Sequence, residues 1–307
     1  MTGIATPSKR QLLRIGHSPD PDDAFMWYPL ASAPGNGGHQ PPMLTDGPKI
    51  DTGSFTFQHV LEDIQSLNDR AERAELEITA ISIHQYAYVA NDYALTTCGA
   101  SMGDGYGPMV VASRDLTLDD LRSGMKIAIP GKRTSAHLAL QLLLGKDAYA
   151  HEVIMFDQII PAVASGQFDA GLIIHEGQLT YGHSGLKCIV DLGKWWKGKH
   201  GLPLPLGGNC IRRDLGDSTM RQICTVLLRS IQYALDPDHR DEAVAYALNF
   251  ARDMSSNLAD QFVGMYVNDW TINYGDDGRR AVDLLLHDAA EAGITPSCGT
   301  IDMVEPG

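Results

Sequence analysis

Leu12-Leu-Arg-Ile-Gly16, His17-Ser-Pro-Asp-Pro-Asp-Asp23 and Ala24-Phe-Met-Trp-Tyr28 follow one another near the start of the chain. The first run is short and apolar, which predicts a β-strand. The second run is dense in Pro and Asp and predicts a tight turn, and the third begins a helix. Strand, turn and helix in this order form the repeating unit of α/β proteins, so this stretch indicates the fold class.

The same alternation continues through the next 150 or so residues, by the same reading of apolar periodicity. A brief strand-like alternation begins at Phe55, further strands are expected over residues 78–82, 109–112, 125–129 and 168–174, and helices over 63–71, 135–144 and 159–166. Beyond Asp214 the apolar spacing becomes helical over residues 220–235, 240–254, 258–266 and 279–292. This pattern predicts mostly parallel sheets covered by helices, with the late helices packed on the first lobe.

The length of 307 residues exceeds that of one typical domain, so two lobes with a cleft between them are expected. Leu202-Pro-Leu-Pro-Leu-Gly-Gly-Asn-Cys-Ile-Arg212 must be extended, because each Pro disfavours helix at the residue before it, and it suits a crossing between lobes. We expect residues 1–111 and 206–307 in the first lobe and 112–205 in the second. The Gly- and Pro-rich segment 32–42 predicts a surface insertion.

The formal net charge of −14 argues against a nucleic-acid partner, because such binding depends on Lys and Arg. An anionic ligand would need a local device such as a helix N-terminus. The five cysteines are odd in number and include no Cys-x-x-Cys, which fits a reducing compartment better than disulfides or a thiolate metal site. With no signal sequence and no run of about 18 apolar residues, we expect a cytoplasmic protein without a membrane partner.

In α/β sheets ligands gather where strands end, and three turns follow predicted strands. The first turn carries Asp20, Asp22 and Asp23 at the start of a helix. Helix capping explains these carboxylates as well as ligand binding does, since Asp commonly accepts from free helical N–H groups. The EF-hand spacing of a calcium loop is absent. The alternative is that an aspartate faces the cleft and accepts a ligand hydroxyl.

The second turn, Gly131-Lys-Arg-Thr-Ser135, places Thr134 and Ser135 at an expected helix N-terminus. A helix N-terminus can bind an anion even in a protein of acidic composition, so a carboxylate could bind there. The spacing is not that of a Walker P-loop, and an ordinary N-cap explains the same residues equally well.

The third turn begins with His175, directly after the apolar run Ala170-Gly-Leu-Ile-Ile174. A histidine at such a strand tip is partly desolvated and could act as a base near neutral pH. A structural histidine that bonds to backbone is the open alternative. Metal binding is disfavoured because Glu176 points oppositely in a strand and no His-x-x-x-His partner follows.

Four ordered motifs together resemble the 1,4-dihydroxy-6-naphthoate synthases of the futalosine route to menaquinone. They are Ser18-Pro-Asp-Pro-Asp-Asp-Ala-Phe25, Ile173-Ile-His-Glu-Gly-Gln-Leu-Thr-Tyr181, Val190-Asp-Leu-Gly-Lys-Trp-Trp196 and Gly201-Leu-Pro-Leu-Pro-Leu-Gly207. Their order and spacing match that family from about Leu13 to Asp214.

The resemblance implies the two-lobe fold of type II periplasmic binding proteins and a lyase that needs neither cofactor nor metal. It implies conversion of cyclic dehypoxanthinyl futalosine, a small carboxylate, to 1,4-dihydroxy-6-naphthoate and dihydroxyacetone. His175 matches the general base of the family. The matching ligand contacts are Asp23, Asn68, Ser82, Thr134 and Ser135.

Asp20 and Asp22 depart from that family, whose members often carry Cys and Asn there, so this turn is more acidic. The sequence leaves open which of the three aspartates contacts the ligand. Two rival functions share the scaffold, solute capture and the dehydration of chorismate. The absence of a signal sequence disfavours the first, and the segments around His175 and Leu202 disfavour the second.

Overall fold

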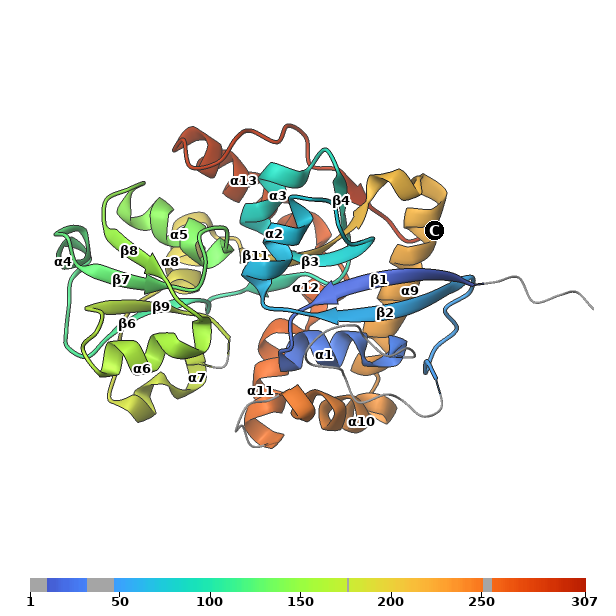
Figure 1. The fold of residues 1–307 in the computed structure, drawn as a ribbon, viewed down its shortest axis with the longest axis horizontal. Helices are drawn as coiled ribbons and strands as arrows, with labels where there is room; N and C mark the ends of the chain where they lie inside the picture. The colour runs from blue at the N-terminus through green and yellow to red at the C-terminus, as the bar shows by residue number, and fades with distance from the viewer. Residues whose placement is uncertain (1–9, 32–46, 176, 251–255) are drawn as a thin grey trace, which may run out of the picture.

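The fold is taken from a computed structural model, which describes residues 10–31, 47–175, 177–250 and 256–307. These residues form two α/β lobes that lie side by side, each built around one β-sheet (Figure 1). The segment expected as a surface insertion over residues 32–42 lies outside the described residues. The predicted two-lobe α/β class is confirmed.

The strand that opens the sequence lies inside the sheet of the first lobe. β1 (Gln11–His17) pairs in parallel with both β2 and β3, which accounts for its apolar residues. The strand order is β12-β4-β11-β3-β1-β2, and β5 pairs with β11. The other strands of this sheet are β2 (Phe55–Leu61), β3 (Ile78–Ser82), β4 (Tyr93–Thr96), β5 (Ser101–Gly103), β11 (Leu204–Arg212) and β12 (Met303–Val304).

The second lobe contains a sheet of order β10-β6-β9-β7-β8. Its central strand β9 is buried at every position, as an unbroken apolar run predicts for a strand with neighbours on both sides. The strands are β6 (Met109–Ala112), β7 (Lys126–Ile129), β8 (Ala150–Val153), β9 (Ala170–Ile173) and β10 (Lys187–Asp191).

Both sheets are mostly parallel, as expected, and each contains one strand that runs antiparallel to the others. β11 runs antiparallel to β3, β4 and β5, and β6 runs antiparallel to β9 and β10. These two strands lie next to the points where the chain passes between the lobes. A chain that crosses into a sheet from the other lobe is not bound by the βαβ connection that makes neighbouring strands parallel.

Helices cover both sheets, and α9 to α13 belong with the first lobe as expected. The helices of the first half are α1 (Pro21–Trp27), α2 (Ile64–Ala71) and α3 (Ile83–Val89). Those of the second lobe are α4 (Leu118–Arg122), α5 (Ser135–Leu144), α6 (Ile159–Ala164), α7 (Gly177–Thr180) and α8 (Leu192–His200). The last helices are α9 (Asp217–Leu235), α10 (Pro237–Ala247), α11 (Ser256–Tyr266), α12 (Asp269–Ile272) and α13 (Gly275–Glu291).

The chain crosses between the sheets twice, after β5 and again before β11. β6 already belongs to the second sheet, three residues before the expected boundary at 111/112, and β11 begins two residues before the expected return at 205/206. The lobe boundaries themselves remain a prediction. The Leu-Pro-Leu-Pro run forms the start of β11, so it is extended where it enters the first sheet.

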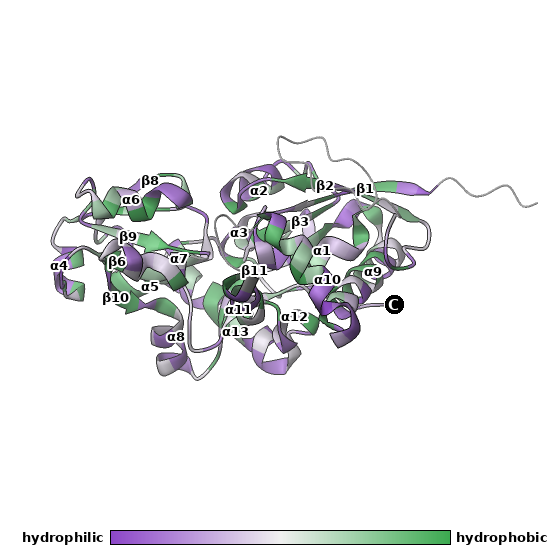
Figure 2. Ribbon diagram, turned by 90° about the horizontal axis from the view of Figure 1, so that it is seen from below, coloured by the Kyte–Doolittle hydropathy of each residue, from purple (hydrophilic) through white to green (hydrophobic). Residues whose placement is uncertain are grey.

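Apolar packing joins the elements within and between the lobes. One buried cluster combines β1 with α1 and the late helices, for example Leu13, Phe25 and Leu227. Another contains residues of both lobes, including Leu138 of α5 and Leu95 of β4. In Figure 2 apolar green follows strands such as β9, whereas α8 at the surface carries much purple.

Among the helices described, none is long and apolar enough to cross a membrane.

Candidate active site

The turn after β1 brings three aspartates to the N-terminus of α1, and each has different surroundings. Oδ2 of Asp23 accepts hydrogen bonds from the backbone N–H of Ser18 at 2.8 Å and from its hydroxyl at 2.9 Å. Burial raises the pKa of Asp23 to about 6, against the opposing effect of these two bonds. Asp23 therefore closes its own turn and also lines a cavity between the lobes.

Asp22 lines the same cavity, but its Oδ1 atom is buried and has no hydrogen-bond partner among the described residues. Burial, together with the nearby Asp23 and Asp20, raises the pKa of Asp22 well above its ordinary value. A protonated carboxyl at this place would present a hydrogen-bond donor to the cavity. A buried polar atom without a partner costs free energy, so this position suits contact with a polar ligand group.

His175 lies opposite these aspartates, at the end of β9 in the second lobe. Its Nδ1 atom is 3.1 Å from Oδ2 of Asp20. Its ring stands edge-on to Phe156, with 4.6 Å between ring centroids. The backbone of His175 has φ of 59°, a left-handed conformation that is uncommon for residues other than Gly. Such conformations cost about 1–3 kcal/mol and cluster at functional sites.

The turn between β7 and α5 supplies the wall next to His175. Thr134 is the N-cap of α5, since its hydroxyl accepts from the N–H of His137 at 3.2 Å and donates to the carbonyl of Gly131 at 2.9 Å. The Ser135 hydroxyl donates to the carbonyl of Leu206 at 2.5 Å and accepts from the N–H of His84 at 3.2 Å. Both hydroxyls are thus engaged within the protein.

Asn68 lies behind the cavity and does not line it in this structure. It is fully buried, accepts from the backbone N–H of Ser82 at 2.9 Å and contacts the Ser82 hydroxyl at 3.1 Å. Its amide also donates to the carbonyl of Arg133 at 3.4 Å. Asn68 therefore holds Ser82, which does line the cavity, and links the first lobe to the second.

The three turns singled out in the sequence meet around one cavity. Of the residues expected to contact the substrate, Asp23, Ser82, Thr134 and Ser135 line it together with His175. The site residues missed in the sequence include Gln178, Phe262 and Tyr266. Tyr266 of α11 donates to the side-chain oxygen of Gln178 on α7 at 2.8 Å, a bond between the lobes. The sequence does not indicate this hydrogen bond, because Tyr266 stands at the spacing of an apolar residue that faces the core from a helix.

The described lining of this cavity contains more acidic than basic side chains. Its described lining contains Asp20, Asp22 and Asp23 but neither Lys nor Arg. An anionic ligand would be repelled by ionised aspartates, so its negative charge is best accommodated at the other wall, at the N-terminus of α5. The first-turn N–H groups of a helix have no backbone partner within the helix and can donate hydrogen bonds to an anion.

Comparison with known proteins decides the family. The sequence model of a menaquinone biosynthesis family matches residues 13–291. The chain belongs to this family. It is 36% identical over 284 residues to 1,4-dihydroxy-6-naphthoate synthase of Thermus thermophilus, covering 92% of this chain and 96% of that protein. The synthase of the same name from Streptomyces coelicolor is 35% identical over 291 residues, covering 94% and 96%.

Solved structures agree with the fold of this menaquinone biosynthesis family member. A crystal structure of a protein from Archaeoglobus fulgidus superposes with a TM-score of 0.82 at 40% identity, covering 94% of this chain and 100% of that one. The ligand-binding component of an ABC-type import system from Staphylococcus aureus gives a TM-score of 0.65 at 12% identity, covering 97% of each chain. The predicted likeness to periplasmic binding proteins is confirmed at the level of the fold.

Proposed function

We propose that this protein is a 1,4-dihydroxy-6-naphthoate synthase. In this proposal it is a carbon–carbon lyase that converts cyclic dehypoxanthinyl futalosine to 1,4-dihydroxy-6-naphthoate and dihydroxyacetone. The relatives that are 35–36% identical over nearly their whole length carry that name, which supports an enzyme of this kind. The single structural observation behind the proposal is His175, whose imidazole lines a cavity between two lobes.

His175 would act as the general base. Its side chain is only 15% exposed, so a proton transfer there would take place largely out of contact with water. An imidazole within reach of the reacting carbon typically accelerates proton abstraction about 10²- to 10⁴-fold. The contact of Nδ1 with Asp20 leaves Nε2 as the ring nitrogen that would accept the proton.

The substrate would lie between the aspartates of α1 and the N-terminus of α5. Its hydroxyl groups would contact Asp23 and Ser82, with Asn68 acting through Ser82 rather than directly. Its carboxylate would bind at Thr134 and Ser135. Because both hydroxyls already have partners, we assign the contact to backbone N–H groups of the first turn of α5.

No cofactor enters this proposal, because proton abstraction by His175 starts the reaction. All five cysteines are free thiols, which fits the cytoplasmic location that we propose with the function. The partner is a small carboxylate molecule rather than a nucleic acid or a membrane.

The decisive experiment is mass spectrometry of the products formed when the purified protein is incubated with cyclic dehypoxanthinyl futalosine. The expected result is a naphthoate and dihydroxyacetone in equal amounts. Tight binding of the substrate without turnover would indicate solute capture instead. A parallel incubation with chorismate tests the other rival, and dehydration of chorismate would reject the proposed function.

A further inference from the structure

Asp20 occupies the N-cap position of α1 but does not cap the helix. Its backbone has the extended conformation of an N-cap residue, with φ of −118° and ψ of 155°, and its carbonyl accepts from the N–H of Ala24 at 2.9 Å. No hydrogen bond from a helical N–H reaches its side chain. An aspartate that caps typically contributes about 1 kcal/mol to stability. The carboxylate of Asp20 therefore gives up a favourable local contact.

The carboxylate points instead across the cleft to the other lobe. Oδ2 of Asp20 lies 3.1 Å from Nδ1 of His175. The two side chains are 4% and 15% exposed, so salt and water screen their interaction little. Of the three aspartates in this turn, Asp23 bonds to Ser18 within its own lobe. Asp20 is the one that makes a close contact with the imidazole.

The imidazole of His175 is thus held from two sides by different lobes. Phe156 supports the ring from within the second lobe, edge-on at 4.6 Å between centroids. Asp20 contacts Nδ1 from the first lobe. Because α1 and β9 belong to different lobes, parting of the lobes would separate Asp20 from His175. The orientation of the ring would then depend on closure of the cleft.

We propose that Asp20 is a positioning residue, which orients His175 by holding the proton on Nδ1 and so keeps Nε2 unprotonated and turned to the substrate when the lobes close. This inference rests on the proposed role of His175 as the base. A carboxylate partner on one ring nitrogen fixes the imidazole tautomer, a general means of preparing the other nitrogen for proton transfer. Asp23 is another titratable group of α1 that interacts with this ring, and Asp22 lines the same cavity.

The test compares Asp20→Asn with Asp236→Asn. Asp236 is an exposed N-cap aspartate whose side chain does cap, accepting from the N–H of Asp238 at 2.9 Å, and Asn caps equally well there. We expect Asp20→Asn to lower kcat about 100-fold with KM within a few-fold of wild type, as a group that acts on the base would. Asp236→Asn should match wild type in both constants.

A double variant adds a readout that a merely structural role would not change. Combined with His175→Asn, the Asp20→Asn change should cause no further loss, because the two residues act as one unit. Wild-type kcat in Asp20→Asn would overturn the inference, and so would a raised KM with unchanged kcat.

Nuclear magnetic resonance of the ¹⁵N-labelled wild-type protein tests the same idea without a variant that could fail to fold. The imidazole signal that His175→Asn removes should belong to a neutral ring protonated at Nδ1. A ring protonated at Nε2 would contradict the role of Asp20. If His175→Asn instead retains activity, the proposed base is wrong. If His175→Asn is inactive but Asp20→Asn is fully active, His175 is the base and only the role of Asp20 is rejected.

Discussion

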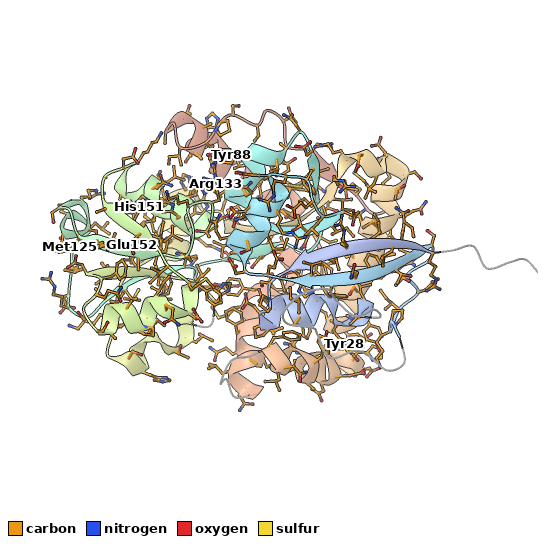
Figure 3. The ribbon with its side chains drawn as sticks, viewed as in Figure 1. Tyr28, Tyr88, Met125, Arg133, His151 and Glu152 are labelled. Carbon is orange, nitrogen blue, oxygen red and sulfur yellow. The ribbon has the colours of Figure 1, made fainter. Side chains whose placement is uncertain are left out.

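The side-chain oxygen of Gln65 accepts a hydrogen bond from the backbone N–H of Arg133 at 3.1 Å. Gln65 belongs to α2 in the first lobe, and Arg133 belongs to the turn before α5 in the second. The guanidinium carbon of Arg133 also lies 3.3 Å from the ring centroid of Tyr88, and Figure 3 shows these two side chains next to each other between the lobes. This turn, which forms the proposed carboxylate site, is thus held by the first lobe.

Gly131→Ala should disturb that connection. A Cβ at Gly131 would lie 2.3 Å from Oε1 and 2.9 Å from Cδ of Gln65. The Gln65 amide would therefore have to move, which would break its hydrogen bond with the N–H of Arg133. One hydrogen bond contributes about 1 kcal/mol, which corresponds to roughly a fivefold change in an equilibrium or rate constant. We expect kcat/KM to fall by about 3- to 10-fold, measured by initial rates with the cyclic substrate.

Gly198→Ala is the matched control for this change. Gly198 lies in α8, and a Cβ there would meet nothing within 4 Å. Ala is favoured over Gly inside a helix by about 0.5–1 kcal/mol, so this variant should be slightly more stable and fully active. Equal kcat/KM in the two variants would show that the contact of Gln65 with Arg133 does not matter for catalysis.

Ser135→Ala tests whether that hydroxyl serves the fold or the substrate. Its partners, the carbonyl of Leu206 and the N–H of His84, would lose a hydrogen bond, which costs about 1–3 kcal/mol for buried groups. We expect urea unfolding to show that loss, while the exposed Ser123→Ala stays within about 0.5 kcal/mol of wild type. Unchanged stability with a strongly raised KM would mean that the Ser135 hydroxyl itself binds the substrate.

The sequence was sufficient for the general position of the site. His175, Asp23 and Thr134 follow strands β9, β1 and β7, and polar residues after such strands meet in one cleft. Their types and order could therefore be interpreted before the fold was known. The strands themselves were predictable because a buried strand appears in the sequence as an unbroken apolar run, such as that of β9.

The sequence did not determine which partner each polar side chain takes. Asp20 has the residue type and backbone of a cap, and only the second lobe explains why its carboxylate turns away. Ser135 and Thr134 have the type and place of an anion site, yet their hydroxyls are bonded within the protein. The hydrogen bond from Tyr266 to Gln178 joins residues 88 positions apart, beyond the reach of any local pattern.

The raised pKa of Asp23 predicts how stability changes with pH. A carboxyl whose pKa is about 6 when folded and 3.8 in its ordinary range binds more protons in the folded state between these values. Its contribution to stability is therefore complete below pH 3.8 and is lost as the pH rises through about 6. Asp23→Asn cannot ionise, so its stability relative to wild type should increase over that interval.

Urea unfolding of both proteins at several pH values between 4 and 7 measures this difference. The two hydrogen bonds from Ser18 can be accepted by the Asn amide oxygen, so the comparison isolates the charge. A difference that is constant with pH would mean that Asp23 has no raised pKa in the folded protein.

His175→Asn is the direct test of the proposed base. Asn tolerates the left-handed backbone of His175, with φ of 59°, better than Ala does, so the variant removes the imidazole with little added strain. We expect kcat to fall about 10²- to 10⁴-fold, with KM and melting temperature close to wild type. His183→Asn, an exposed histidine in the same lobe, is the control and should be fully active. Turnover by His175→Asn within a few-fold of wild type would move the proton abstraction to another group that lines the same cavity.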